Sequence, residues 1–120
     1  MHMHPTRRSR LAILLALVVS LTSSALADVA TWEKLTVAGT AVGLSSTTIT
    51  PSGRPDRKAC ILTLETAQIR WRVDGTSPDA TTGHIMDPGG AITVRGQADL
   101  SRFRAIRTGG SSGVLSVTCW

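Results

Sequence analysis

Histidine and carboxylate side chains lie close together in the stretch ATTGHIMDPGG, where His84 has Asp87 after it and Asp79 just before the stretch. An imidazole near carboxylates can transfer protons or bind a metal. A nucleophilic triad would also need a serine on a defined strand-to-helix turn, whereas the one GxSxG of the sequence, at residues 109–113, lies in the turn between two predicted strands. Zinc sites need three or four ligands at recognisable spacing. We therefore expect His84 to be an exposed loop residue, and we expect no enzyme activity, cofactor or metal.

The segment DGTSPD, residues 74–79, is rich in oxygen ligands of the kind that calcium prefers. It lacks the alternating acids and the closing glutamate of a calcium loop. Asp74 before Gly75 is typical of a turn, and Ser-Pro is typical of an extended entry to the next loop. The segment therefore predicts the end of a strand followed by a turn.

Arginines recur on the strands that the pattern predicts, and some of them should face solvent. Such a face could attract acidic glycans, lipopolysaccharide or phosphate. The alternative is that these arginines are solvated or paired, with Glu65 and Asp74 as partners across a hairpin. The arginines concerned are Arg70, Arg72, Arg95, Arg104 and Arg107.

Two tryptophans, Trp32 and Trp120, stand apart from the other aromatic residues, and an exposed indole could stack on a sugar. The alternative is packing in the core or at an edge. We expect any partner to touch the loop 75–89 and the arginine-bearing strand before it. The candidate contact surface comprises Arg70, Arg72, Asp74, Asp79, His84, Asp87, Trp32 and Trp120.

The sequence has two cysteines, Cys60 and Cys119. In an exported chain they are most simply a disulfide pair, which would close a loop of nearly the whole domain. Both are in phase with aliphatic neighbours in alternating segments, which favours a buried bridge across the core. A metal or redox role would need more ligands or a CxxC spacing.

Residues 1–27 have the pattern of a secretory signal peptide. Arg7, Arg8 and Arg10 precede an apolar run at residues 11–21, and small residues follow up to Ala27. We expect cleavage after Ala27 and a secreted or periplasmic chain. An uncleaved N-terminal anchor is the alternative, but the run is shorter than the roughly 20 residues of a membrane span.

The net charge of +5 comes largely from this leader. The chain has 13 basic and 8 acidic residues, and three arginines but no acid lie in the leader, so residues 28–120 carry 10 minus 8, or +2. A nucleic-acid surface would normally need a concentrated basic stripe. We therefore expect no nucleic-acid partner, and no membrane association after cleavage.

Residues 28–120 predict a single all-β domain, because short alternating runs are separated by Gly, Pro, Ser and Asp. Residues 42–50 could be a short helix or a strand, and residues 97–102 a turn or a short helix. The loop 51–58 should be exposed, since it has two prolines, a glycine and four charges. We expect two hairpins, the first joining strands 59–65 and 69–74 and the second joining strands 103–108 and 114–119. Further strands are expected at 34–38 and 91–95.

The second half of the chain has a recognisable pattern: R-x-R-x-D-G-x-x-P, a G-H step, a glycine before a strand, and F-R-A-I-R. Over residues 60–120 it resembles a group of short phage and prophage proteins, some of them virion-associated structural proteins. Asp79 stands where that pattern has threonine, and a leader with a cysteine pair is unexpected in a cytoplasmically assembled virion part. The matching residues are Arg70, Arg72, Asp74, Gly75, Pro78, Gly83, His84, Gly90 and residues 103–107.

This resemblance implies an assembly or surface-binding domain without catalysis. Together with the alternation, it predicts a compact antiparallel β-sandwich or partly open barrel of about six to seven strands. The expected function is an exported, non-catalytic structural or interaction module whose partner is a protein assembly or a surface glycan. The alternative is a small secreted carbohydrate- or ligand-binding domain.

Overall fold

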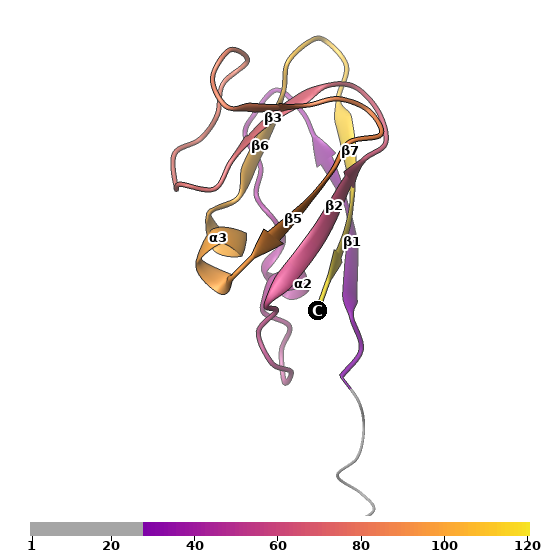
Figure 1. The fold of residues 1–120 in the computed structure, drawn as a ribbon, viewed down its shortest axis with the longest axis vertical. Coiled ribbons are helices and arrows are strands. Elements are labelled where there is room, and N and C mark those ends of the chain that lie inside the picture. The colour runs from indigo at the N-terminus through magenta and orange to yellow at the C-terminus, as the bar shows by residue number, and fades with distance from the viewer. Residues whose placement is uncertain (1–27) are drawn as a thin grey trace, which may run out of the picture.

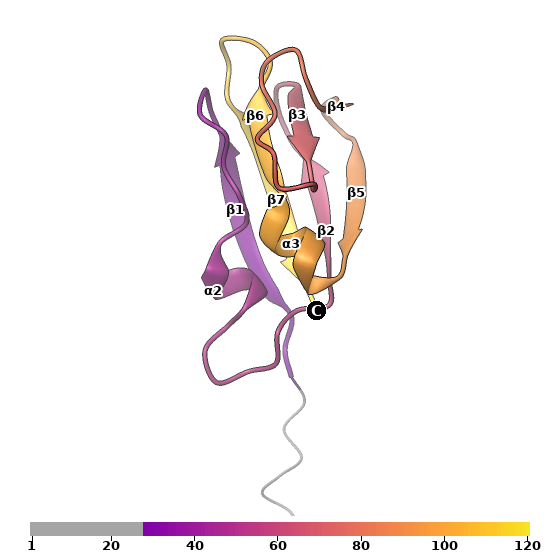
Figure 2. The same cartoon turned by 90° about the vertical axis from the view of Figure 1, so that its left-hand side faces the viewer.

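The computed structural model describes residues 28–120, so the predicted signal peptide at residues 1–27 lies outside the described part of the chain. Seven strands form two antiparallel sheets packed face to face, as Figures 1 and 2 show from two sides. The all-β prediction is therefore confirmed. No helix within residues 28–120 is long and apolar enough to span a membrane.

The larger sheet has four strands in the order β1-β7-β2-β5. Its inner face is apolar because alternate side chains of each strand point to the same side. In β7, for example, Leu115, Val117 and Cys119 are fully buried and the residues between them are not. The four strands are β1 (Thr31–Val37), β7 (Gly113–Cys119), β2 (Ala59–Leu64) and β5 (Ala91–Arg95).

The smaller sheet has three strands in the order β4-β3-β6. It covers the inner face of the larger sheet, and Ile69, Phe103 and Ala105 are fully buried between the two layers. The strands are β4 (His84–Met86), β3 (Ile69–Arg72) and β6 (Arg104–Arg107).

Neither predicted hairpin exists. β2 and β3 are consecutive but belong to different sheets, and so do β6 and β7. The apolar sides of β2 and β3 face each other across the core instead of lying side by side. The layers approach closely where these connections cross: a Cβ on Gly113 would lie 2.5 Å from the Ile69 Cγ2 atom. Alternation identifies which side of a strand is buried, but not which strand it pairs with.

Two short helices close one end of the sandwich: α2 (Ser46–Ile49) and α3 (Gln97–Arg102). Leu100 of α3 is fully buried and Ile49 of α2 is nearly so, and the two helices lie near each other at the lower end of Figure 1. The structure thus resolves both open alternatives in favour of a helix. Val42 forms a single antiparallel bridge to Ala105.

Cys60 and Cys119 form the predicted disulfide, and both are fully buried. They stand directly opposite each other on β2 and β7, with their Cα atoms 4.0 Å apart. The bond therefore joins neighbouring strands of one sheet and does not cross between the layers as predicted. The bond joins residues that are 59 positions apart. In the chain-entropy model, closing a loop of this size stabilises the fold by about 4 kcal/mol.

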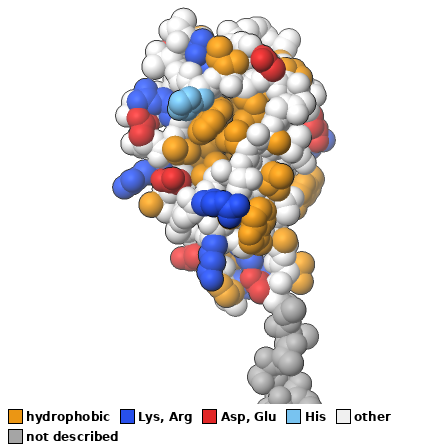
Figure 3. Space-filling view, in the orientation of Figure 1, with side chains coloured by type: hydrophobic (Ala, Val, Ile, Leu, Met, Phe, Trp, Pro, Cys, Tyr) orange, Lys and Arg blue, Asp and Glu red, His pale blue; other side chains and the backbone are white. Residues whose placement is uncertain are grey.

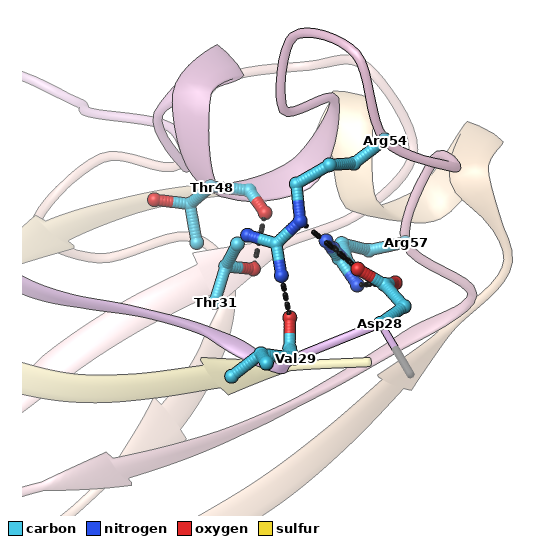
Figure 4. A network of polar contacts seen from close by, with 6 residues as sticks. All are labelled: Asp28, Val29, Thr31, Thr48, Arg54 and Arg57. Carbon is cyan, nitrogen blue, oxygen red and sulfur yellow. Dashed lines mark hydrogen bonds and ion pairs between the residues drawn. The ribbon is translucent and has the colours of Figure 1, made fainter. Parts of the chain in front are cut away.

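Most of the loop 51–58 is exposed as predicted, but Pro51 and Arg57 are buried. Arg57 is only 3% exposed, and its guanidinium donates to both carboxylate oxygens of Asp28. Arg54 also donates to Asp28 and to the Val29 carbonyl (Figure 4). The composition of the loop predicts a turn, but it does not indicate that a distant carboxylate allows one of its arginines to be buried.

Candidate binding surfaces

Arg70 of β3 holds the long loop 73–83 against the smaller sheet. Its Nε donates to the Ala80 carbonyl at 3.1 Å, and its Nη1 donates to the Gly83 carbonyl at 2.8 Å. Gly83 has φ +129°, and a Cβ there would lie 3.2 Å from the Trp71 carbonyl oxygen. Arg70 and Gly83 therefore fix the path of the loop.

Arg72 is paired with Asp74 at the point where β3 ends. The guanidinium donates to both carboxylate oxygens of Asp74, which also accepts the Thr76 N–H at 3.1 Å. These hydrogen bonds lower the pKa of Asp74, with that from Arg72 the largest cause, and the same bond raises the pKa of Arg72. The other proposed partner, Glu65, pairs with Lys34 instead.

Asp79 stabilises the tip of the same loop. Its carboxylate accepts hydrogen bonds from the Thr81 N–H at 2.8 Å, the Thr81 hydroxyl at 2.9 Å and the Thr82 N–H at 2.7 Å. These contacts, led by the Thr81 backbone N–H, lower the pKa of Asp79. The DGTSPD segment is thus a strand end and a turn, as its sequence predicts.

His84 is exposed as predicted, but it begins strand β4 and is not in a loop. It stands opposite Trp71, and the two ring centroids are 4.8 Å apart. Asp87 accepts a hydrogen bond from Gln68 instead of approaching the imidazole. In the part of the chain that the structure describes, no three His, Cys, Asp or Glu side chains group to hold a metal ion.

Part of the predicted contact surface does come together. An open hollow of about 400 Å³ has Arg72, Asp74 and His84 in its lining. Asp79 and Asp87 are not among the residues that line it, and the two predicted tryptophans lie on the other sheet. The polar side chains around this hollow are largely engaged with one another or with the loop backbone.

Trp32 and Trp120 lie on the outer face of the larger sheet. Trp32 stands opposite Thr118 on β7, and Thr118 stands opposite Ile61 on β2. Trp120 continues β7 and exchanges two backbone hydrogen bonds with Ala59, so its side chain points to the same side as Thr118. Trp32 and Ile61 therefore flank Thr118 on the two neighbouring strands, and Trp120 is the next residue of its own strand on the same side. Trp120 is a diagonal neighbour of the other two, at a distance of roughly 7–8 Å, so the three apolar side chains surround Thr118.

These three side chains are exposed: Trp32 by 62%, Trp120 by 48% and Ile61 by 41%. We call this surface, with its neighbouring hydroxyl groups, the tryptophan face. The indole N–H of Trp32 donates to the Ser116 hydroxyl at 3.4 Å. The other hydroxyls in the same phase belong to Thr36, Thr63, Thr93 and Thr118.

Ile61 is not among the contact residues predicted from the sequence, although its position in the alternating pattern of β2 would have indicated it. Cys60, Leu62 and Leu64 are on the buried side of β2, so Ile61 is an apolar residue on the solvent side. Trp32 has the same relation to its strand, where Lys34 and Thr36 share its phase. An apolar residue in the polar phase of a strand is therefore the pattern that would have indicated this face.

Comparison of the chain with protein family models, with curated proteins and with solved structures finds no match.

Proposed function

We propose that this chain is a non-catalytic interaction module that acts outside the cytoplasm and contacts its partner through the tryptophan face. The observation that carries the proposal is the placement of Trp32, Ile61 and Trp120 around Thr118 on one exposed sheet face. Tryptophan is enriched at the centres of binding sites because it buries a large area at little entropic cost. The disulfide supports an oxidising compartment.

The ligand that best suits this face is a surface glycan. Indole rings stack on the apolar faces of sugars, and hydroxyl groups beside them can hydrogen bond to sugar hydroxyls. The face offers both: two exposed indoles, and the hydroxyls of Ser116 and Thr118 between or beside them. Neighbouring strands fixed by the Cys60–Cys119 bond would hold these groups in place without a large entropic cost on binding.

The second candidate is a structural module of a protein assembly, as the resemblance to phage proteins implies. It is supported by the open side of the sandwich between β4 and β5, described below. On this proposal the loop 73–83 and the arginines of β3 are scaffold, because Arg70, Arg72 and Asp79 make their hydrogen bonds within the loop and this strand.

Affinity electrophoresis in gels that contain soluble polysaccharides of neutral and acidic classes tests the glycan proposal. We expect retardation by at least one neutral polysaccharide, and we expect the paired change Trp32→Ala with Trp120→Ala to abolish it. The matched control is Arg70→Ala with Arg72→Ala, which should retain binding. Retardation by acidic polysaccharides alone, lost in the arginine variant and kept in the tryptophan variant, would favour the arginine-bearing strand instead.

A further inference from the structure

The two sides of the sandwich are closed differently. On one side, residues 38–42 run from the larger sheet to β6: Val42 and Ala105 exchange two hydrogen bonds of 2.9 Å, and the Arg107 N–H donates to the Ala38 carbonyl. On the other side, β5 and β4 are joined by residues 87–90 and do not pair (Figure 2). Among residues 28–120, the edge of β5 therefore has no neighbouring strand.

The hydrogen bonds between β5 and β2 show which backbone groups this edge presents. The Gly96 N–H donates to the Lys58 carbonyl at 2.7 Å, and the Leu64 N–H donates to the Gly90 carbonyl at 2.9 Å. In an antiparallel ladder, alternate residues bond to one neighbour and those between them point to the other side. Three residues therefore direct their N–H and C=O groups away from β2: Ala91, Thr93 and Arg95.

Apolar side chains lie beside this edge. An open groove of about 340 Å³ is lined by Trp71, Met86, Ile92 and Ile85, and Ile85 is 51% exposed. Figure 3 shows hydrophobic side chains gathered in the middle of the face that carries β5. An unpaired strand edge beside an exposed apolar surface is the arrangement that takes up a further strand.

We propose that the occupant is β5 of a second copy of this chain, paired antiparallel across a two-fold axis at Thr93. Each Thr93 then stands opposite its counterpart, and Ala91 stands opposite Arg95 of the partner copy, so no like charges face each other. The larger sheets of the two copies join into one continuous sheet. The groove beside Ile92 is covered by the same surface of the partner copy.

The charges at the two ends of the edge favour a second copy over an unrelated strand. Asp87 precedes β5 and Arg95 ends it, and both are exposed. An antiparallel two-fold arrangement brings the basic end of one copy toward the acidic end of the other. The inference is independent of glycan binding, because edge-to-edge pairing of β5 leaves the outer face of the larger sheet exposed, with Trp32, Ile61 and Thr118 on β1, β2 and β7.

Analytical ultracentrifugation of the purified chain over a dilution series tests the inference. We expect a monomer–dimer equilibrium that Thr93→Pro abolishes. Proline is tolerated on an edge strand where the lost N–H points away from the neighbouring strand, so the pairing of β5 with β2 is kept. Thr93→Val retains the N–H and is the matched control, which should dimerise as the native chain does. A thermal melt of each variant shows that it is folded.

Substitutions at Ala91 give a second test that does not depend on proline. Ala91→Lys places a like charge opposite Arg95 of the partner copy, twice per dimer, whereas Ala91→Glu places an opposite charge there. We expect the dimer dissociation constant to rise about fivefold in the first and to fall about fivefold in the second. Opposite responses at this exposed residue are specific to the proposed register.

A chain that stays monomeric at the highest concentration, or a dimer that Thr93→Pro leaves intact, would overturn the inference. Equal responses to Ala91→Lys and Ala91→Glu would overturn the register. Affinity electrophoresis of Ala91→Lys, at a concentration at which it is monomeric, separates this inference from the proposed function, because Ala91 contributes neither an indole nor a hydroxyl to the tryptophan face. If a monomeric variant is still retarded, glycan binding does not require the dimer. If the Trp32→Ala/Trp120→Ala variant is no longer retarded but remains fully dimeric, the dimer does not require the tryptophans.

Discussion

The outer faces of the two sheets use their polar and aromatic side chains in different ways. On the smaller sheet, Arg70 and Arg72 make hydrogen bonds to the following loop and to Asp74. On the larger sheet, Trp32 and Trp120 are exposed, and the strands beneath are held by a disulfide. A charged side chain on a surface strand can thus be a structural element, while an exposed aromatic side chain that contributes little to folding is available for a partner.

The largest effect should come from removing the disulfide beneath the tryptophan face. Cys60→Ser with Cys119→Ser removes the covalent link between residues that are 59 positions apart, so the unfolded chain gains conformational entropy. This should lower the free energy of unfolding by about 4 kcal/mol. Urea denaturation monitored by tryptophan fluorescence measures this loss. An unchanged midpoint would show that the larger sheet does not depend on its covalent bond.

A smaller loss is expected on the other face from Arg70→Ala. This change removes two charge-assisted hydrogen bonds to the Ala80 and Gly83 carbonyls and should cost about 2 kcal/mol. Hydrogen exchange should increase in residues 73–83 and stay the same in β7. Arg95→Ala is the control, because the Arg95 side chain is exposed and makes no hydrogen bond or ion pair within residues 28–120, so the exchange rates of that loop should stay unchanged.

Acid should weaken the contact of Asp28 with Arg57, which lies outside both faces. The hydrogen bond from Arg57 lowers the pKa of Asp28, so its stabilisation is complete above the unfolded-state pKa near 4 and is lost as pH falls through the lower folded-state value. Asp28→Asn should lower the melting temperature by a few degrees at neutral pH. Calorimetry from pH 7 to strong acid should show this difference vanish, and Asp56→Asn, at an exposed residue of the same loop as Arg57, is the control that should keep the native melting temperature at neutral pH.

The smallest effect on stability is expected from the tryptophan face. Trp32→Ala should change the free energy of unfolding by no more than about 0.5 kcal/mol, because the side chain is 62% exposed. Urea denaturation of Trp32→Ala and of Arg70→Ala under the same conditions measures the loss in the free energy of unfolding for each. A loss from Trp32→Ala as large as that from Arg70→Ala would mean that the tryptophan is a structural residue too.

Much of the fold follows from local pattern. Alternation in residues 59–64 and 113–119 identifies the strands and their buried sides, and it places both cysteines on the buried side. Strand pairing does not follow, because β2 and β3 bury the same kind of surface whether they are neighbours or opposing layers. The two predicted hairpins failed for this reason.

Single residues of the candidate site could be predicted from the sequence, but their arrangement could not. Trp32 and Trp120 could be selected one by one, but their meeting around Thr118 depends on the register of β1 with β7, which joins residues more than 80 positions apart. The burial of Arg57 depends likewise on Asp28, 29 residues away. Contacts of this range are set by the packing of the whole domain and leave no trace in a short window of sequence.

Hydroxyl-radical footprinting tests most directly which face meets the partner. The purified chain is oxidised with and without surface polysaccharide from the producing cells, and oxidation at each residue is measured by mass spectrometry. We expect Trp32 and Trp120 to become protected while His84, beside the arginine-bearing strand, reacts as before. Protection of His84 with both tryptophans still reactive would mean that the tryptophan face is not the binding surface.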